Sequence, residues 1–256
     1  MITTGDCIDQ LAAIPPGTVN LVVADPPYNI GIDYGDGKQA DRLRPERYIE
    51  WTRAWIDAAA RALAPDGSLW IICGQEYQAH HDLAIQAAGL TMRNRVTWYE
   101  SFGVNCRTKF SRTSRPIFYA VKHPRRFTFN AAAVRVPSAR ATKYRDKRAA
   151  PGGKIMDDVW AIPRVCGTFR ERLAGFPTQL PMALVERIVL CSTDPGHLVV
   201  DPFAGSGTTG VVCLQHRRRF VGFELRDEFA RAARRRLDEA AQAFTDDQHH
   251  QGVPRR

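Results

Sequence analysis

The segment from Leu198 to Thr209 constrains the fold more than any other part of this 256-residue chain. It reads LVVDPFAGSGTT, in which an apolar run ends in Asp201 and continues through a glycine-rich turn. A short, continuously apolar run of this kind is typical of a strand buried in a parallel sheet. Glycines in the turn let the backbone come close to a ligand, because they carry no Cβ. The segment therefore predicts a β-strand, a ligand-binding turn and then an α-helix.

Two features near this turn indicate which ligand it would bind. A phosphate-binding loop needs Lys followed by Ser or Thr after its last glycine, whereas Gly207 is followed by two threonines. About 20 residues later, Glu224 follows the apolar run 220–223, and an acid at a second strand end suits the hydroxyls of a ribose. The pair predicts a site for an adenosine-type cofactor. An ordinary glycine-rich turn without a ligand is the alternative, since such turns are common.

Apolar periodicity along the rest of the chain predicts strands that alternate with helices. The expected strands are 21–24, 68–73, 95–99, 116–121, 197–200 and 220–223, and the expected helices are 46–64, 76–88, 180–191, 206–216 and 226–242. Strands that alternate with helices imply a mostly parallel sheet covered on both faces. Pro65-Asp66-Gly67 is expected to end a helix, and the polar segment after Phe244 is expected to fray.

A second local motif follows the expected strand 21–24. Its residues are Asp25, Pro26, Pro27 and Tyr28. The prolines fix φ and stiffen the turn, which would hold a carboxylate, a proline carbonyl and an aromatic ring in one geometry. The carboxylate and the carbonyl suit the two N–H bonds of an amino group, and the ring suits a base extruded from a duplex. A proline-stiffened loop with an incidental aspartate is the alternative interpretation.

Charge points to a polyanionic partner. The chain has a formal net charge of +9 and a pI of about 9.5. The region 122–176 lacks a long apolar period and is rich in Lys and Arg with aromatic residues between them, so it is interpreted as an inserted, loop-rich module that contacts nucleic acid. A solvated basic loop is the alternative. A solvated face is also expected for the arginines of the last helix, which are Arg231, Arg234, Arg235 and Arg236.

In their order along the chain, these motifs resemble the β group of amino-methylating DNA methyltransferases. In that group the Asp-Pro-Pro-Tyr motif comes first, the target-recognition region second and the cofactor motif last, as they do here. Further matches are Gly5-Asp6, 157–163, 176–179 and Glu186-Arg187-Ile188. The resemblance implies an α/β, circularly permuted Rossmann-like S-adenosylmethionine-dependent methyltransferase fold. Its sheet would have seven mostly parallel strands, with one antiparallel hairpin strand.

The resemblance also implies roles for individual residues. The catalytic residues would be Asp25, Pro26, Pro27 and Tyr28. The cofactor would be S-adenosylmethionine, bound by Asp6, Asp25, Thr178, Asp201, Phe203, Gly205, Ser206, Gly207, Thr208 and Glu224. The partner would be double-stranded DNA, bound by Arg125, Arg126, Arg140, Lys143, Arg145, Lys147 and Arg148. Around Pro-Thr-Gln the chain departs from the family, which usually has His and Lys-Pro where this chain has Phe176 and Leu180-Pro181.

The function that the resemblance implies is enzymatic: site-specific methyl transfer from S-adenosylmethionine to the exocyclic N6 of adenine in DNA. Covalent attack for cytosine C5 methylation is unsupported, because the chain has no Pro-Cys dipeptide. N4-cytosine methylation is the alternative, although the family most often has Ser in place of Asp25 for that chemistry. A protein or RNA methyltransferase and a non-catalytic DNA-binding relative are weaker alternatives. The motif order argues against the former, and intact Asp25, Tyr28 and Gly205 argue against the latter.

These matches predict the domain organisation and the surroundings of the protein. A catalytic and cofactor domain would span 1–121 and 177–243, a target-recognition insert 122–176 and a polar tail 244–256. Scattered cysteines without a CxxC pair, and no signal peptide or apolar span of roughly 20 residues, predict a cytoplasmic protein without a membrane partner. No residues at metal-ligand spacing are visible, so no metal is expected. The resemblance allows a homodimer and a separate restriction enzyme in a restriction-modification system.

Overall fold

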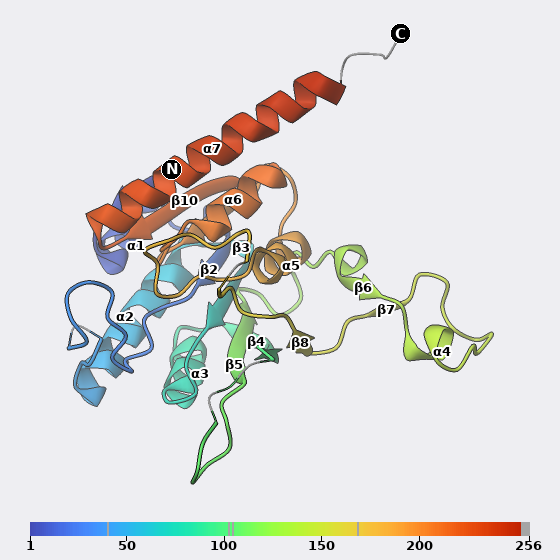
Figure 1. Cartoon of the computed structure of the whole chain (residues 1–256), viewed down its shortest axis with the longest axis horizontal. Coiled ribbons are helices and arrows are strands. Elements are labelled where there is room, and N and C mark those ends of the chain that lie inside the picture. Colours follow the sequence, from blue (N-terminus) through green and yellow to red (C-terminus); the bar gives the residue numbers. More distant parts are fainter. Residues whose placement is uncertain (40, 102, 104, 168, 252–256) are drawn as a thin grey trace.

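The computed structural model describes residues 1–251 except 40, 102, 104 and 168, and from 245 to 251 it describes the backbone alone. Its centre is a sheet of eight strands (Figure 1). Every pairing in this sheet is parallel except the two that β5 makes, which confirms the α/β class and the antiparallel hairpin strand. The strands lie in the order β1 (Ile2–Thr4), β10 (Arg219–Glu224), β9 (Leu198–Asp201), β2 (Val19–Ala24), β3 (Leu63–Ile72), β5 (Ser114–Val121), β4 (Thr91–Tyr99) and β8 (Val159–Ala161).

Helices cover both faces of the sheet, which is why its central strands are apolar on both sides. One layer contains α1 (Cys7–Ala13), α2 (Pro45–Ala62) and α3 (Gln78–Ala87), and the other contains α5 (Met182–Ser192), α6 (Thr208–Gln215) and α7 (Asp227–Gln251). In β2, Leu21 and Val23 belong to the core beneath α5, whereas Val22 and Ala24 belong to the core beneath α2. No helix in the described part of the chain is long and apolar enough to cross a membrane.

The strand β3 begins earlier than predicted. The Pro65-Asp66-Gly67 turn was expected to separate helix from strand, but β3 starts at Leu63, one residue after α2 ends. Between the Val19–Leu63 pair and the Leu21–Ser68 pair, β2 advances by two residues and β3 by five. The turn is therefore accommodated as a bulge within the strand, where the unpaired proline costs the sheet no hydrogen bond.

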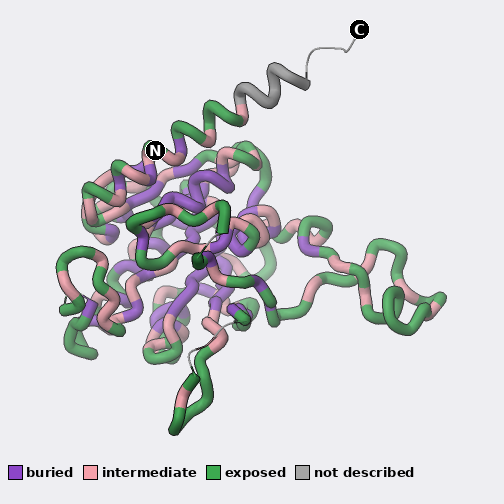
Figure 2. The backbone as a smooth tube through the Cα atoms, viewed as in Figure 1, coloured by how far each residue is buried: buried purple, intermediate pink, exposed green. Residues whose placement is uncertain are grey.

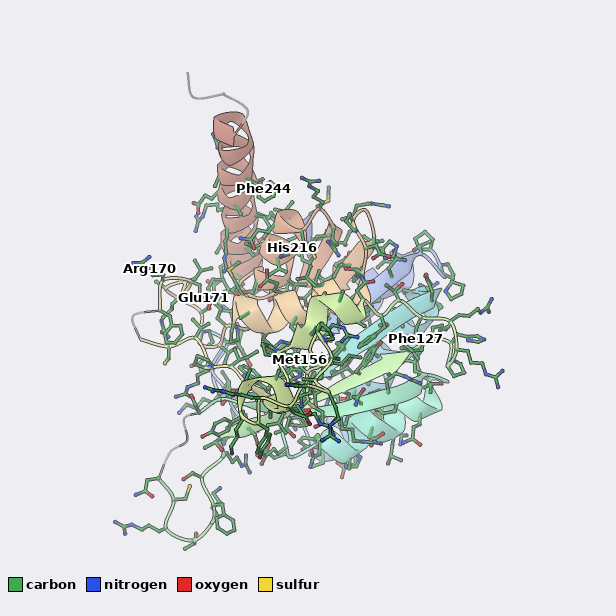
Figure 3. All side chains as sticks on the ribbon, turned by 90° about the vertical axis from the view of Figure 1, so that its right-hand side faces the viewer. Phe127, Met156, Arg170, Glu171, His216 and Phe244 are labelled. Atoms are coloured by element: carbon green, nitrogen blue, oxygen red, sulfur yellow. The ribbon has the colours of Figure 1, made fainter. Side chains whose placement is uncertain are left out.

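Part of the region 122–176 belongs to the body of the molecule. Trp160, in β8, is 5% exposed, and the Trp98 indole donates to the Ile162 carbonyl at 2.7 Å. Phe127 and Met156 also pack against the core (Figure 3). Because β8 pairs with β4, the sheet has eight strands and the prediction of seven is wrong. A strand of three residues has too few positions to show a period in the sequence.

The rest of that region is an arm that projects from the body (Figures 1 and 2). A short 3₁₀ helix, η1 (Ala131–Val134), leads into it. The arm consists of a two-stranded sheet, β6 (Arg135–Val136) with β7 (Lys154–Ile155), and the one-turn helix α4 (Ala139–Thr142). Most of its residues are exposed. The arm is therefore shorter than the predicted insert, and the predicted domain boundaries stay a prediction.

The last helix, α7, is longer than predicted. The expected helix was 226–242, followed by a polar tail from 244, whereas α7 runs from Asp227 to Gln251. Between Phe244 and Gln251 the sequence contains no glycine or proline, and the next two are Gly252 and Pro254. Polar composition alone does not end a helix, because Gln, Asp and His cost the helix far less than Gly or Pro. For this reason the prediction that the helix ends at residue 242 was wrong.

Candidate active site

The carboxyl ends of four neighbouring strands, β1, β10, β9 and β2, meet at a cavity of about 290 Å³. Parallel sheets bind ligands at this edge because the loops that follow the strands gather there. Asp6, Glu224, Asp201 and Asp25 come from the segments at the ends of these strands, and all four line the cavity. The topology therefore brings together the two motifs that lie near opposite ends of the sequence. Among the described residues, no group of His, Cys, Asp or Glu is placed to hold a metal ion.

The glycine-rich turn after β9 is held by two acids. The Asp201 carboxylate accepts hydrogen bonds from the Phe203 N–H at 2.9 Å and the Thr209 hydroxyl at 2.6 Å, and Glu224 accepts from the Gly205 N–H at 2.9 Å. Burial raises the pKa of Asp201 to about 7, and its hydrogen bonds oppose that rise. Gly205 has φ of +48°, and a Cβ there would meet only the Phe203 carbonyl oxygen, at 3.8 Å. The turn therefore presents open space to the cavity.

All the predicted cofactor residues except Gly207 line the cavity. Gly207 precedes α6 at φ of +75°, and a Cβ there would lie 3.0 Å from Leu237 Cδ1 on α7. The missing side chain of Gly207 therefore permits α6 and α7 to pack closely. Its place in the motif is explained by helix packing and backbone conformation, whereas Gly205 faces the cavity.

The Asp-Pro-Pro-Tyr motif takes part in a charged network with Arg115 and Glu100. The Tyr28 hydroxyl donates to Asp25 Oδ1 at 2.5 Å. The Arg115 guanidinium lies 5.0 Å from the centre of the Tyr28 ring and donates to the buried Glu100 carboxylate. Burial raises the pKa of Asp25 to about 6, while the Arg115 charge and the Tyr28 hydrogen bond oppose the rise. The Arg115 charge and the Tyr28 hydroxyl therefore favour the ionised, hydrogen-bond-accepting form of Asp25 in the wall of the cavity.

The chain is similar to known proteins over almost its whole length. A family model described as DNA methylase, N6_N4_Mtase, matches residues 19–235. The chain belongs to this DNA methylase family. The DNA adenine methyltransferase YhdJ of Escherichia coli (strain K12) is 35% identical over 248 residues, which cover 94% of this chain and 83% of that protein. The Type II methyltransferase M.HpaI of Haemophilus parainfluenzae is 32% identical over 242 residues, which cover 93% and 74%.

Solved structures share the fold of the methylase. The M1.HpyAVI–SAM complex superposes with a TM-score of 0.67 at 21% identity, covering 93% of this chain and 98% of that one. The PvuII DNA methyltransferase, described as cytosine-N4-specific, has a TM-score of 0.67 at 18% identity, covering 94% and 90%. These likenesses confirm the predicted methyltransferase fold.

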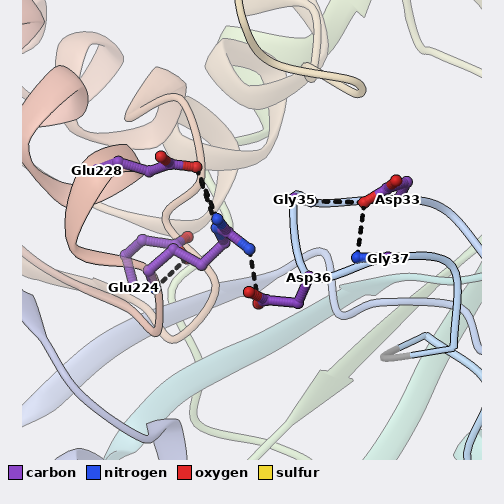
Figure 4. Close-up of polar contacts among 7 residues, drawn as sticks. Asp33, Gly35, Asp36, Gly37, Glu224 and Glu228 are labelled. Carbon is purple, nitrogen blue, oxygen red and sulfur yellow. Dashed lines mark hydrogen bonds and ion pairs between the residues drawn. The ribbon is translucent and has the colours of Figure 1, made fainter.

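The loop after the Asp-Pro-Pro-Tyr motif of the methylase lines one side of the cavity. The buried Asp41 carboxylate accepts hydrogen bonds from the backbone N–H groups of residues 29–32. Arg226 then pairs with Asp36 of this loop at 2.6 Å and with Glu228 at 2.8 Å (Figure 4). Arg226 therefore connects the loop to the end of β10, which carries Glu224. The sequence shows glycines and acids here, but no pattern that predicts this pairing.

An aromatic wall replaces the histidine that the family usually has before Pro-Thr-Gln. The Phe176 ring centre lies 4.8 Å from that of Phe229 on α7, and both rings line the cavity. Leu180, where the family usually has Lys, lines it too. The departures seen in the sequence thus make this wall apolar. Thr178 lies between them in the chain and also lines the cavity, and its role in cofactor binding stays a prediction.

Two arginines of α7 support the site. Arg236 donates to the Ser206 carbonyl and the Thr208 hydroxyl, both at 3.0 Å. Arg234 donates to the backbone of β1 and to a threonine hydroxyl at its end, both at 2.9 Å. The expectation of a solvated face is therefore wrong for these two residues. Helical periodicity could not reveal it, because the partners lie far away in sequence.

Helix α2 and the segment before it also hold the loop that carries the Asp-Pro-Pro-Tyr motif. Tyr48, a buried residue of α2, donates its hydroxyl hydrogen to the Pro27 carbonyl at 2.7 Å. Asn29 has φ of 60°, and its side chain makes two hydrogen bonds with the Leu43 backbone, at 2.6 and 3.0 Å. The sequence predicts Tyr48 as a core residue of an amphipathic helix and nothing more. Its contact with the motif depends on how α2 packs.

The predicted DNA-binding residues lie in two separate places. Arg125 and Arg126 follow β5, and because β5 is antiparallel they lie at the edge of the sheet opposite to the cavity. Asp146 on the arm pairs with Arg148 at 3.0 Å and with Arg140 at 3.8 Å. The structure does not bring the two groups together, and their role in DNA binding stays a prediction. The residues on the arm are Arg140, Lys143, Arg145, Lys147 and Arg148.

Proposed function

We propose that the methylase transfers a methyl group from S-adenosylmethionine to the exocyclic N6 of adenine at a specific sequence in double-stranded DNA. The observation that carries the proposal is that Asp25 lies in the wall of the same cavity as the glycine-rich turn and Glu224. A relative at 35% identity is named a DNA adenine methyltransferase. The family most often has Ser in place of Asp25 for N4-cytosine methylation, so this residue favours adenine.

The cavity fits S-adenosylmethionine. The Glu224 carboxylate still has acceptor capacity beyond its hydrogen bonds from Gly205 and Arg226, which suits ribose hydroxyls. The apolar wall of Phe176 and Phe229 suits an adenine ring, and the ionised Asp25 favours a cationic sulfonium. When bound, the cofactor supplies an electrophilic methyl group on that sulfonium.

The residues of the catalytic loop would then act on the target base. Asp25 accepts a hydrogen bond from the amino group and so directs the nitrogen lone pair into the cavity. Tyr28 offers a ring for stacking, and because Arg115 lies over one face, the base would use the other face. When the nitrogen gains a methyl group it releases one proton, and the Asp25 carboxylate is the acceptor that faces it. Tyr48 and Asn29 keep the loop rigid throughout.

The proposed function is tested by incubating the purified protein with unmethylated DNA and methyl-labelled S-adenosylmethionine. After digestion to nucleosides, the label should appear in N6-methyladenine. Label in N4-methylcytosine would contradict the choice of base and leave the cofactor assignment intact. An absence of label from DNA, with the cofactor bound, would contradict the proposed function.

The pH dependence of turnover should report the ionisation of Asp25. A protonated carboxyl accepts the amino hydrogen bond poorly, so turnover is present above the pKa of about 6 and is lost as pH falls through it. Arg115 lowers this pKa and Glu100 raises it. The midpoint of the acid limb should therefore move to higher pH in Arg115→Met and to lower pH in Glu100→Gln. The measurement is kcat against pH at saturating cofactor and DNA.

Arg95→Met is the matched control for this experiment, since Arg95 makes an exposed ion pair with Asp82 on α3. Its acid limb should coincide with that of the unmodified protein. If the acid limb of the pH profile does not move in Arg115→Met or in Glu100→Gln, the ionisation of another group governs turnover. Asp201, with its pKa raised to about 7, is the first such group to examine.

Charge reversal on the arm should weaken DNA binding in a salt-dependent way. Arg145 and Lys147 have no acidic partner among the described residues, whereas Arg148 pairs with Asp146. In Arg145→Glu/Lys147→Glu the negative slope of log affinity against log salt concentration should become shallower by about two, because two phosphate contacts are lost. Affinity at low salt should fall about tenfold or more, measured by fluorescence anisotropy with duplex DNA.

The control for charge alone is Arg231→Glu/Arg235→Glu, which reverses two exposed charges on α7. Its salt slope should remain within about half a unit of the unmodified value. Cofactor affinity should be unchanged in both double variants. An unchanged slope in the arm variant would return these residues to the solvated-loop interpretation.

We also propose a role in DNA modification beside a separate restriction enzyme. M.HpaI and other relatives at 29–35% identity are named Type II methyltransferases, which supports this role. A homodimer and a cytoplasmic location stay predictions. Analytical ultracentrifugation over a range of protein concentrations tests the dimer directly.

A further inference from the structure

The loop between β4 and β5 contains an almost fully exposed aromatic side chain. Phe110 is 98% exposed. The loop projects from the body separately from the arm (Figures 1 and 2). An isolated exposed apolar residue is ordinary on a protein surface, but a phenylalanine that is 98% exposed in a projecting loop packs against almost nothing in the part of the chain that the structure describes.

The charges around Phe110 are of one sign. Between Glu100 and Arg115 the sequence contains three cations and no acid. Arg107 and Lys109, which precede Phe110 by three residues and one residue, are exposed, and Arg112 is paired with Glu76. An aromatic ring flanked by cations is complementary to nucleic acid, where the ring meets base faces and the cations meet phosphates.

The base of this loop lies in the catalytic site. β4 runs parallel to β3 and β2, so its carboxyl end lies at the same edge of the sheet as Asp25. Across the loop, Glu100 pairs with Arg115, whose guanidinium lies 5.0 Å from the Tyr28 ring centre. Phe110 precedes Arg115 by five residues, a reach of at most about 17 Å. That reach exceeds the depth of the DNA major groove, about 8.5 Å.

We propose that Phe110 is a DNA wedge that enters the base stack beside the target adenine and stabilises its extrusion into the catalytic site. This inference rests on the proposed function. A base held against Tyr28 has left a gap in the duplex, and apolar side chains that enter such gaps compensate for lost stacking. Arg107 and Lys109 bind the phosphates on either side of the gap and hold the ring in place.

A protein partner or a second copy of the chain is the competing occupant for an exposed phenylalanine. The cations beside Phe110 and the origin of the loop at the catalytic edge favour DNA. A protein contact at Phe110 would not explain why the loop begins next to Tyr28. Sedimentation of the Phe110 variant distinguishes the two occupants.

The test uses a duplex that carries the target site, identified first by mapping the adenines that the unmodified protein methylates. In one duplex the target adenine is paired with thymine, and in a second it faces an abasic site and so is already unpaired. Phe110→Ala should lose about tenfold or more in kcat/KM on the paired duplex, the scale of one lost aromatic–base stack. On the unpaired duplex the loss should shrink to about threefold or less. Phe110→Trp, which keeps a ring, should stay close to the unmodified protein on both.

Leu83→Ala is the matched control, because Leu83 is a 55% exposed apolar residue on α3. It should leave both rates unchanged. Full activity of Phe110→Ala on the paired duplex would overturn the wedge, as would an equal loss on both duplexes, which a general DNA contact predicts. A change in sedimentation with unchanged DNA kinetics would instead assign Phe110 to a protein interface. If the unmodified protein methylates no DNA, the proposed function fails, a result separate from any behaviour of the Phe110 variant.

Discussion

Asp25→Ala is expected to lower turnover by a factor of about 100 or more while the variant still binds DNA and the cofactor, the latter with a smaller loss of affinity because the carboxylate beside the sulfonium is gone. The substitution removes the acceptor that orients the amino group, and loss of a positioned catalytic group has an effect of this size. The glycine-rich turn is held by Asp201 and Glu224 through hydrogen bonds that do not involve Asp25. Single-turnover rates give the chemical step, and isothermal titration and fluorescence anisotropy give the two affinities.

Folding must be controlled in this experiment, because Asp25 also accepts a hydrogen bond from Tyr28 and faces the Arg115 charge. Asp25→Asn keeps the shape and one acceptor oxygen but loses the charge, so it should unfold at nearly the temperature of the unmodified protein. Its turnover should still fall strongly. Full turnover in a folded Asp25→Ala protein would show that the proposed mechanism is wrong.

Gly205→Val is expected to weaken S-adenosylmethionine binding by a factor of about 100 or more. Gly205 lines the cavity, and a Cβ there would meet no protein atom closer than the Phe203 carbonyl oxygen at 3.8 Å. The valine side chain would therefore occupy space that the ligand needs. Its φ of +48° is also unfavourable for a β-branched residue, so part of the effect is backbone strain.

Gly196→Val separates these two causes. Gly196 has φ of +86°, a Cβ at this position would meet no atom within 4 Å, and the residue does not line the cavity. The variant should lose thermal stability to a similar degree as Gly205→Val and still bind the cofactor normally. Equilibrium dialysis with labelled cofactor and thermal unfolding measure the two effects. Normal cofactor affinity in a folded Gly205→Val protein would contradict the placement of the cofactor over this turn.

The contacts between residues far apart in the chain could not be predicted from the sequence. Arg115 lies 90 positions from Asp25, and nothing in the pattern of β5 distinguishes it from any other polar residue at a strand end. The same holds for Arg226 with Asp36 and for Phe176 with Phe229. Each pair forms because two segments at one edge of the sheet fold over the same cavity. The Arg115 charge that acts on Asp25 from another strand leaves no local signal in the chain.

Short segments could not be predicted either, because they hold too few residues to show a periodic pattern. β8 has three residues, too few for periodicity, yet Trp160 is buried and extends the sheet by one strand. The loop that carries Phe110 gives no periodic signal, and the exposure of Phe110 in a projecting loop depends on the β4–β5 pairing. In the opposite sense, the polar segment after Phe244 stayed helical because no residue in it breaks a helix.

The sequence by itself determined the features whose physics is local. The apolar strand, the acid and the glycines of 198–209 specify a strand, a turn with positive φ and a helix, and Asp25 to Tyr28 specify a stiff acidic loop after a buried strand. Only the tertiary structure decided that these motifs share one cavity, that burial raises the pKa of Asp25 against the opposing effects of Arg115 and Tyr28, and that Arg236 of α7 holds the glycine-rich turn. Propensity and turn chemistry act over a few residues, whereas burial, charge pairing and strand order arise only when distant segments pack together.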